Sequence, residues 1–592
     1  MFETLIWLVP LAVAVLGAWR PRAGLVVLVA TLPFFGAPPG GPYMSALDLA
    51  AIAAILTAWR GHWPERSALN WAAAAFILVS LMTLIPSPYA PPSWRPLTLL
   101  ALLQSLPEVE SWSALYTWRS AADLILGFGL FLATQRAFAG RSIRPLCWAM
   151  LAGLGAVMIL GLASQAELID LSPYRPAYAS SGGRLQSVFF LTGWLSEYLV
   201  LATPVGVAVL ATGRRRMKSL VPAVGVLSVV CIALTLQRGA WVALAGQMIF
   251  SAFLLIRHQR PTRRQTRRLA QTAAASIAMI TIVLVASGSA SGIVKRATDI
   301  QSGFTTRAPL WKAAIQMFVK RPLSGQGLGA FSPAYSHLHA KASEDRKRFH
   351  SSAHNLYLQV VAERGAVGLA GLGLLIAAGI ASLAKPKPDQ QMLALGLAAS
   401  LFGALIYGLV QYMMYVRAIH WMLWFLLACS GLVAQRREGQ IPKAVLALLA
   451  VGLLLVPIRL LPAAKPLPFA GNRSFGFHDQ EHDSVGPFRW TGRRAALRLE
   501  RGRGDLILSF ANGHPQGSKR PVTVEVGIDG TIVTTLPIRD GWEEHKIAVP
   551  ASARNWVLLT IEAQPTFRPF NDFASEDVRS LGIAMREPKW SN

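Results

Sequence analysis

Apolar runs of about 17–22 residues recur along most of the chain, and they restrict the fold more than any other feature. A run of roughly 20 apolar residues is long enough to cross the hydrocarbon core of a bilayer as a helix. Only 15% of the residues are charged, against roughly 25% in a soluble globular protein. We therefore predict a polytopic α-helical membrane protein.

The runs predict about fourteen spans, which form a transmembrane domain over residues 1–461. We expect the first span to be a retained helix, because no basic segment precedes it and no cleavage site is clear after it. The three cysteines lie inside spans, so they predict neither a disulfide framework nor a metal site. The predicted spans lie near 4–19, 23–35, 46–59, 68–85, 114–134, 146–164, 189–212, 219–236, 239–256, 269–287, 366–384, 392–413, 417–434 and 444–461.

The net charge of +27 would suit a nucleic-acid-binding protein, but the positions of the charges argue against that class. Most Lys and Arg residues lie in short turns between apolar runs, and these turns alternate with turns nearly free of them. This is the positive-inside pattern of membrane proteins. If the N-terminus is outside, every basic turn is cytoplasmic. Residues 288–365 and the C-terminal tail then both lie outside the membrane, among membrane lipids and without nucleic acid.

The tail, residues 466–592, changes to short alternating apolar runs such as VTVEVGI and TIVTTLPI. Asp529-Gly530 between these two runs predicts a hairpin with a two-residue turn. We predict an all-β sandwich domain. Near its end, DVRSLGIAM resembles the final strand of jelly-roll modules in glycan-processing proteins. Two roles stay open: carbohydrate binding, with Trp542 or Trp556 stacking on sugars, and a structural or docking role.

The stretch from Arg307 to Gly368 brings Arg, His, Glu, Tyr and Asn together in a mostly apolar chain, so it is the candidate reaction centre. Arg307 to Val319 has the spacing of an amphipathic helix at the membrane interface, and Pro322 marks its end. The glycines of SGQGLGAF resemble a phosphate-binding loop. However, the loop follows no strand and lacks an adjacent Lys-Ser/Thr, so we expect tight turns beside the membrane.

Four histidines follow this helix, and they allow two interpretations. His337, His339, His350 and His354 could supply zinc ligands, but Lys, Arg and Glu between them favour a solvated loop. His354 directly precedes NLYLQVVAERG, a predicted helix leading into a span, so its imidazole would lie at the membrane boundary. Glu363 is about 900° further round that helix and faces away from His354.

Five arginines lie on the predicted outer side, against the positive-inside bias. Each one alone is explained by snorkelling at the interface. Together they favour a bound anion, because planar guanidinium groups bind phosphate in a bidentate manner and stay charged. The anion would be a phospholipid headgroup or a lipid pyrophosphate. The five are Arg184, Arg238, Arg307, Arg364 and Arg417.

The ordered set TLQRGAWVAL, RAPLWKAAIQMFVKRPLSGQGLGAF and AHNLYLQVVAERGAVGL resembles the O-antigen ligase and O-antigen polymerase superfamily, over about residues 180–435. The usual pattern there is Arg-Gly after a span, then a loop with Arg and a Trp-containing helix. A Pro-x-x-Gly-x-Gly turn, His-Asn-x-Tyr-Leu and Glu-x-Gly follow. Family members often have Ser before the Arg-Gly, where this chain has Gln237. The tail is not part of the shared core.

The resemblance implies a glycosyltransferase of the bacterial inner membrane with a periplasmic catalytic loop, residues 288–365. Its donor would be a glycan on undecaprenyl pyrophosphate. Its acceptor would be lipid A–core, another glycan chain or a protein. The resemblance implies that Arg238 and Arg307 engage the pyrophosphate and that His354 acts at the acceptor or leaving group. We also expect His350 and Tyr357 to bind substrate, and we expect no cofactor or metal.

The chemistry of the residues agrees with this expectation. The periplasm has no ATP, so the donor must carry its own activation, and arginines can stabilise a leaving pyrophosphate. An imidazole, with an ordinary pKa of about 6.5, can accept the proton of an acceptor hydroxyl. We predict an inverting, metal-independent transfer with His354 as general base. Polymerases and ligases share these motifs, so both stay open, and a glycan-binding tail would favour a polymerase. The alternatives are a protein O-oligosaccharyltransferase, a scaffold, and a lipid-linked sugar transporter or flippase that uses Asp48, Asp123 or Glu197.

Overall fold

The structure is a computed structural model of the chain. It describes residues 7–35, 45–59, 67–84, 112–171, 183–259, 300–331, 335, 352–435, 441–460, 474–514, 520–529, 531–551, 556–567, 569 and 581–591. The predicted span at 269–287 and the predicted substrate residue His350 lie outside the described residues. So do His337 and His339 of the zinc alternative, and residues 461–473 between the two predicted domains.

Helices make up the described part of the chain up to residue 460, apart from the turns that join them. The first half contains α2 (Leu8–Trp19), α3 (Pro21–Thr31), α4 (Ala46–Ala58), α5 (Ala68–Met82), α7 (Trp112–Phe138), α8 (Arg144–Gln165), α9 (Thr192–Ala211), α10 (Arg215–Lys218), α11 (Val221–Leu234) and α12 (Arg238–Gln259). The second half contains α15 (Ile300–Lys320), α17 (Leu356–Ala384), α18 (Gln391–Tyr407), α19 (Arg417–Val433) and α20 (Lys443–Leu460).

Seven helical segments in the described residues are long and apolar enough to cross a membrane, so the prediction of a helical, multi-pass membrane protein is confirmed. Shorter apolar helices of 10–17 residues coincide with the other predicted spans in the described residues. The total of about fourteen spans stays a prediction. The seven segments are Arg119–Phe138, Arg144–Gln165, Thr192–Ala211, Arg215–Leu234, Arg238–Ile256, Leu356–Ala384 and Pro388–Tyr407.

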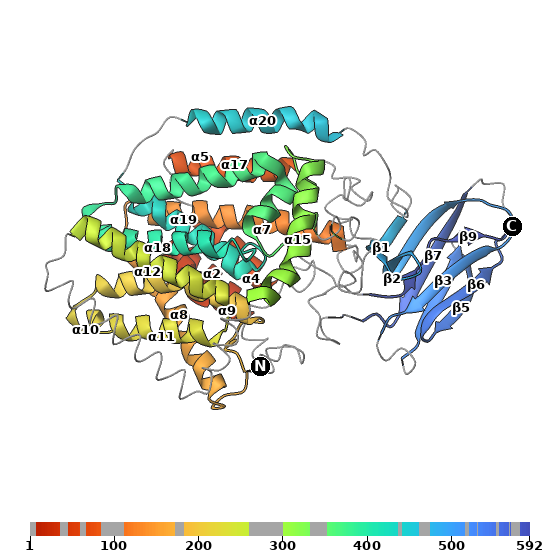
Figure 1. The fold of residues 1–592 in the computed structure, drawn as a ribbon, viewed down its shortest axis with the longest axis horizontal. Helices are drawn as coiled ribbons and strands as arrows, with labels where there is room; N and C mark the ends of the chain where they lie inside the picture. Colours follow the sequence, from red (N-terminus) through yellow and green to blue (C-terminus); the bar gives the residue numbers. More distant parts are fainter. Residues whose placement is uncertain are drawn as a thin grey trace.

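The bundle has α9 near its centre, where most of its side chains from Thr192 to Leu210 are buried. Figure 1 shows α15 lying across one end of the bundle, steeply inclined to the helices beside it, with the β-strands beyond that end. The arrangement places the start of α12, the start of α17 and the end of α18 near α15. These are the segments on which the predicted reaction centre depends.

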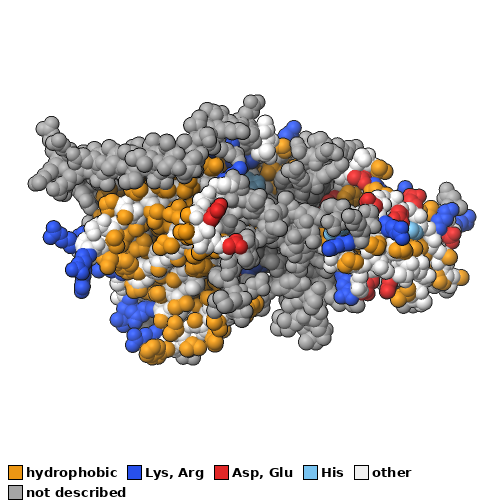
Figure 2. Space-filling view, turned by 90° about the horizontal axis from the view of Figure 1, so that it is seen from below, with side chains coloured by type: hydrophobic (Ala, Val, Ile, Leu, Met, Phe, Trp, Pro, Cys, Tyr) orange, Lys and Arg blue, Asp and Glu red, His pale blue; other side chains and the backbone are white. Residues whose placement is uncertain are grey.

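The surface of the bundle separates apolar from basic residues. Figure 2 shows a broad hydrophobic face over the described helices, with Lys and Arg gathered at the end away from the β-strands. The basic helix α10 lies at that end in Figure 1. An apolar belt with basic residues at one end is the distribution expected of a membrane protein whose cytoplasmic side carries those residues.

The C-terminal region is all-β, as predicted. Its main strands form one continuous antiparallel sheet in the order β5-β4-β7-β2-β8-β3-β6, whereas a sandwich implies two separate sheets. The long β2 joins the halves, since its C-terminal part pairs with β7 and its N-terminal part with β8. The strands are β1 (Ser474–His482), β2 (Pro487–Glu500), β3 (Leu506–Asn512), β4 (Val522–Ile528), β5 (Thr531–Ile538), β6 (Gly541–Ile547), β7 (Trp556–Gln564), β8 (Ala584–Met585) and β9 (Lys589–Trp590).

The predicted hairpin is confirmed, because Ile528 pairs with Thr531 and so leaves two residues for the turn. The first of these, Asp529, has a φ of 51°, the left-handed conformation that such a turn requires. Both halves of the sheet contribute to a single apolar core, to which Phe510 and Ile561 belong. The boundaries of the two predicted domains stay predictions.

Trp542 in β6 is held by its neighbours. The Arg586 guanidinium lies 3.9 Å from the centre of its ring, and its indole N–H donates a hydrogen bond of 2.8 Å to Asp483. Phe488 packs against it edge to face, with 5.6 Å between ring centres. These contacts support the structural role for Trp542 rather than sugar stacking. The side chain of Trp556 lies outside the description.

Candidate active site

The start of α17 holds His354 in a constrained conformation. Asn355 caps the helix: its side chain accepts a hydrogen bond from the Leu358 N–H and donates one of 2.7 Å to the Leu409 carbonyl, just beyond α18. The Tyr357 hydroxyl donates a hydrogen bond of 2.8 Å to the carbonyl of Leu405, a residue of α18. These contacts fix the histidine on the end of α18. His354 itself has a φ of 47°, a left-handed conformation that costs about 1 kcal/mol or more in a non-glycine residue and is often found at functional sites.

A chain of hydrogen bonds links His354 to a buried carboxyl. His354 Nδ1 lies 2.9 Å from Gln411 Oε1, and the Gln411 side chain also hydrogen-bonds the Glu197 carboxyl. Glu197 is 1% exposed. The Gln411 oxygen faces His354, and its amide nitrogen is left to face Glu197. An amide oxygen only accepts, so Nδ1 carries the proton, and Nε2 of the neutral ring keeps its lone pair.

Three of the predicted arginines converge beside this chain. The Leu185 N–H donates 3.0 Å to the Leu234 carbonyl, which places Arg184 against the turn between α11 and α12. Arg238 is the first residue of α12 at that turn. Burial, opposed in part by Tyr407, lowers the pKa of Arg307 on α15, and the neighbouring Arg238 charge lowers it further. Two guanidinium groups close enough to repel each other favour an anion between them.

Tyr407 at the end of α18 connects the arginines to the histidine chain. Its hydroxyl lies 2.7 Å from Ser196 Oγ on α9, one residue before Glu197. It interacts electrostatically with Glu197 on one side and Arg307 on the other. The tyrosine, the carboxyl and the arginine therefore belong to one polar group inside the end of the bundle. The side-chain amide of Gln237 donates a hydrogen bond of 2.7 Å to the Thr192 hydroxyl, which connects the turn between α11 and α12 to α9. Gln237 is the residue at which the family often has Ser.

The interfacial helix α15 is also attached to the histidine segment. The Trp311 indole N–H donates 3.0 Å to the Ala353 carbonyl, immediately before His354. Leu310, Met317 and Ala353 share one buried apolar cluster. The helix begins at Ile300, before the start at Arg307 that the sequence predicts, and it packs its apolar face against the peptide that carries His354.

The glycine loop of residues 322–331 packs against α17, in agreement with the prediction of tight turns. Its N–H groups bind the helix rather than pointing to an open site: Gly327 donates 2.8 Å to the Glu363 carbonyl, and the Glu363 side chain accepts from Phe331. A side chain at Gly325 would overlap the backbone of Glu363. The helix itself breaks at Gly365, which has a φ of 65° and a ψ of −165°. Glycine is required there, because the Leu323 carbonyl lies where the Cβ of another residue would be. The Glu-Arg-Gly sequence thus docks the loop.

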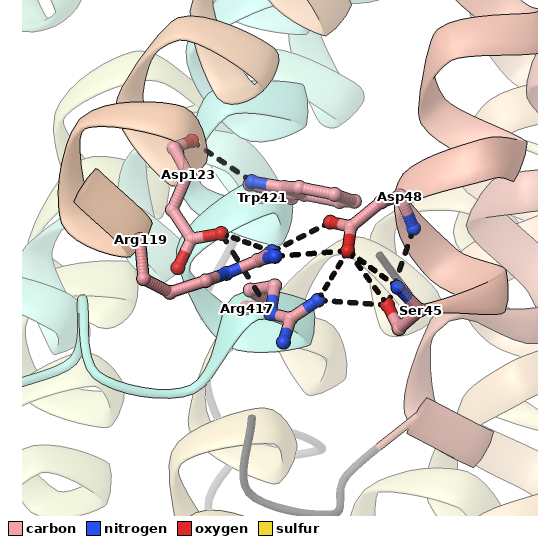
Figure 3. A network of polar contacts seen from close by, with 6 residues as sticks. All are labelled: Ser45, Asp48, Arg119, Asp123, Arg417 and Trp421. Atoms are coloured by element: carbon pink, nitrogen blue, oxygen red, sulfur yellow. Dashed lines mark hydrogen bonds and ion pairs between the residues drawn. The ribbon is translucent and has the colours of Figure 1, made fainter. Parts of the chain in front are cut away.

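Arg417, a predicted substrate-binding residue, lies in a buried cluster of four charged residues. Its Nη1 lies 2.7 Å from Asp48 Oδ2, and its Nε lies 3.7 Å from Asp123 Oδ1. Arg119 pairs with the same two aspartates, at 2.5 Å each. Figure 3 shows the four side chains facing one another, with Ser45 at the edge. Two arginines balance two aspartates, and the cluster fastens α4, α7 and α19 together.

Arg364 is also separate from the His354 group. Its side chain is 1% exposed, lies 5.3 Å from the centre of the Phe76 ring and hydrogen-bonds Tyr412. The structure therefore divides the five predicted arginines: Arg238 and Arg307 interact with each other and belong to the group that includes Tyr407, Arg184 adjoins the turn that carries Arg238, and Arg364 and Arg417 lie around a second polar group. Their binding roles stay predictions.

Two residues of the site were not predicted for it. Gln411 lay inside a predicted span, and Glu197 was considered only for a transporter. Both are polar side chains within apolar runs, and that was the available signal. Room for the Gln411 amide comes from Gly193, where an added Cβ would lie 3.3 Å from its nitrogen. In the described part of the chain, no group of three or more His, Cys, Asp or Glu side chains could hold a metal ion.

Comparison with known families agrees with this geometry. No curated protein matches the chain. A family model described as O-antigen ligase matches residues 223–373. The matched segment includes Arg238, Arg307 and His354, while Glu197 and Gln411 lie outside it. Residues 223–373 are thus similar to the O-antigen ligase (Wzy_C) family, within a multi-pass helical membrane protein.

Proposed function

We propose that the protein transfers or polymerises a glycan from an undecaprenyl-pyrophosphate donor at the periplasmic face of the inner membrane. The family match supports lipid-linked glycan transfer as the reaction class. The observation that most supports this proposal is the contact of 2.9 Å between His354 Nδ1 and Gln411 Oε1. It leaves the other ring nitrogen as a base beside a group of arginines, and glycan transfer to a hydroxyl needs both.

In this proposal His354 is the general base. Nε2 takes the proton of the acceptor hydroxyl while the hydroxyl oxygen forms a bond to the anomeric carbon. The bond from that carbon to the pyrophosphate oxygen breaks, and its electron pair leaves with undecaprenyl pyrophosphate. Gln411 keeps the ring oriented, and its amide oxygen accepts from the Nδ1–H of the protonated ring that forms. A single displacement inverts the anomeric configuration.

In the same proposal Arg184, Arg238 and Arg307 hold the pyrophosphate. The charge on the leaving group grows as the glycosidic bond breaks, and fixed guanidinium groups stabilise that charge. Tyr407 interacts electrostatically with both Arg307 and Glu197 and so connects this group to the histidine. Tyr357 is committed to Leu405 through its hydroxyl, so its ring, next to His354, is the part available to the acceptor.

The charge distribution supports the proposed periplasmic location. The Lys and Arg of the described helices gather at the end away from the β-strands (Figure 2), and α15 lies at the opposite end (Figure 1). By the positive-inside rule the active-site end faces out. A transporter is disfavoured, because two of the three acidic residues considered for one, Asp48 and Asp123, are paired with Arg119 and Arg417, and the third, Glu197, hydrogen-bonds Gln411. We favour a polymerase of O-antigen or exopolysaccharide over a ligase or a protein O-oligosaccharyltransferase.

The experiment is to incubate the purified protein with undecaprenyl-pyrophosphate glycan, with and without a chelator. Extension of the donor glycan identifies a polymerase, and transfer only to added lipid A–core identifies a ligase. Equal rates with the chelator support arginines as the pyrophosphate-binding groups. If neither acceptor is glycosylated while the protein is folded, the proposed function is wrong for these substrates.

A further inference from the structure

A second polar pocket lies beside the candidate active site. It is separated from it by the segment between α18 and α19, in which Gln411 contacts His354 and the next residue, Tyr412, contacts Arg364. The pocket is lined by Arg119, Ser120, Asp123, Leu124, Arg364, Tyr412, Met414, Tyr415 and His420. Its walls come from α7, α17, α19 and this segment, so it lies at the same end of the bundle as His354.

Two buried side chains present hydrogen-bond donors in this pocket. Among the described residues, no acceptor lies within hydrogen-bond distance of Arg364 Nε or Nη1. His420 is 2% exposed, and its Nε2 accepts a hydrogen bond of 3.2 Å from the Trp424 indole N–H. An indole nitrogen only donates, so the proton of His420 is on Nδ1, which also lacks an acceptor in the described part of the chain. Three N–H groups therefore need an oxygen partner.

The charges around the pocket also favour an anion. Arg119 and Arg417 are balanced by Asp48 and Asp123, as Figure 3 shows, which leaves the charge of Arg364. The neighbouring Glu363 carboxyl also interacts electrostatically with Arg364, but its Oε1 already accepts hydrogen bonds from Gln359, at 2.8 Å, and from the Phe331 N–H. Buried guanidinium groups recur at phosphate-binding sites.

We propose that this pocket binds a phosphate group of the acceptor substrate, while Arg184, Arg238 and Arg307 bind the pyrophosphate of the donor. The inference rests on the proposed function, since only a transferase needs a second substrate at this place. It gives Arg364 a different anion from the one that its sequence position predicts. An acceptor anchored here would lie across the Gln411–Tyr412 peptide from His354, with its glycan extending towards the base.

The binding test uses inorganic phosphate as the probe and the full-length protein in nanodiscs of neutral lipid. Phosphate should raise the thermal unfolding temperature of the wild type. Arg364→Gln and Arg307→Gln should each remove part of the rise, and the double variant should remove nearly all of it, because independent sites contribute additively. Lys312→Gln, a change of an exposed residue on α15, should behave as wild type. Arg364→Lys keeps the charge and serves if the Gln variant does not fold.

The second readout is kinetic and separates this inference from the proposed function. Arg364→Gln should raise the KM for the acceptor at least tenfold and change the KM for the donor less than twofold, whereas Arg307→Gln should do the reverse. If the phosphate response is unchanged in Arg364→Gln and Arg364→Lys, the pocket is not an anion site. If phosphatidylglycerol in the nanodisc abolishes the Arg364-dependent response, the pocket takes bulk headgroups and the acceptor assignment is wrong. If the wild type transfers nothing but keeps that response, the proposed function fails and the anion site stands.

Discussion

His354 Nδ1 lies 2.9 Å from Gln411 Oε1, and this contact assigns the proton of the imidazole ring to one nitrogen. The glutamine oxygen can only accept, and its amide group is oriented by the buried Glu197. In catalytic triads a carboxyl group orients an imidazole base directly. Here the Gln411 amide lies between the imidazole and the carboxyl. Gln411 is therefore a positioning residue in the proposed reaction.

Replacing Gln411 by Leu should remove this orientation and leave the base in place. We expect kcat to fall about 10- to 100-fold, as for other residues that orient a catalytic group, with KM for the donor nearly unchanged. The check is to measure kcat and KM for the donor at several pH values. Without Gln411, the His354 imidazole has no partner that selects one tautomer. Gln391→Leu, a change of an exposed residue at the start of α18, is the matched control. An unchanged kcat in Gln411→Leu would show that the contact is incidental.

Breaking the ion pair between Arg417 and Asp48 should destabilise the bundle. Removal of one partner of a buried pair leaves an uncompensated charge and costs about 3–5 kcal/mol. Arg417→Met should therefore unfold at a clearly lower temperature, and adding Asp48→Asn should recover part of the loss. The alternative expectation, that Arg417 binds substrate, gives the opposite pattern: unchanged thermal stability with a raised KM for the donor.

Gly365→Ala should displace the glycine loop from α17. Gly365 has a φ of 65°, and an added Cβ would overlap the Leu323 carbonyl, so we expect a loss of about 3 kcal/mol and strongly reduced transfer. Gly373→Ala on the same helix is the control, since a Cβ there meets nothing within 4 Å and should be neutral or slightly stabilising. Equal unfolding temperatures for the two variants would contradict the docking role.

The β-region should lose stability in acid through Asp483. Partial burial raises the pKa of this carboxyl, but hydrogen bonds from Arg586 and from backbone N–H groups outweigh burial and lower the pKa to about 2. A group with a lowered folded-state pKa stabilises the fold above its unfolded pKa, about 3.9, and the contribution is lost as the pH falls towards 2. Amide hydrogen exchange in β2 and β8 of the full-length protein would measure this loss. Asp483→Asn should flatten the dependence between pH 4 and pH 2 and cost about 1 kcal/mol at neutral pH. An unchanged acid profile in Asp483→Asn would assign the loss to other carboxyls.

Hydropathy and local motifs were sufficient for much of the fold. The predicted spans in the described residues coincide with helices, because the burial of apolar runs in lipid depends on length and composition alone. The Asp529-Gly530 hairpin was also predictable, since its turn type depends on two adjacent residues. The continuous β-sheet was not, because the pairing of β2 with both β7 and β8 depends on contacts between distant strands.

Sequence motifs predicted only those parts of the site whose residues lie within a single segment of the chain. His354 at a helix start could be read from His-Asn-x-Tyr-Leu, and the amphipathic α15 from its spacing. The partners of His354 and Arg417 come from other helices, and a single sequence contains no distances between helices. The break at Gly365 was hidden as well, because Glu-Arg-Gly reads as continuous helix until the glycine loop is packed against it.

The most direct test of the account is the transfer rate of His354→Asn with undecaprenyl-pyrophosphate glycan as donor. Asn tolerates the left-handed conformation of residue 354, and its amide can still donate to Gln411, so the variant should fold like the wild type. It lacks a basic nitrogen, and loss of a general base lowers rates by roughly 10²- to 10⁴-fold. We predict a wild-type unfolding temperature with transfer reduced at least a hundredfold. Transfer at the wild-type rate by folded His354→Asn protein would contradict the account.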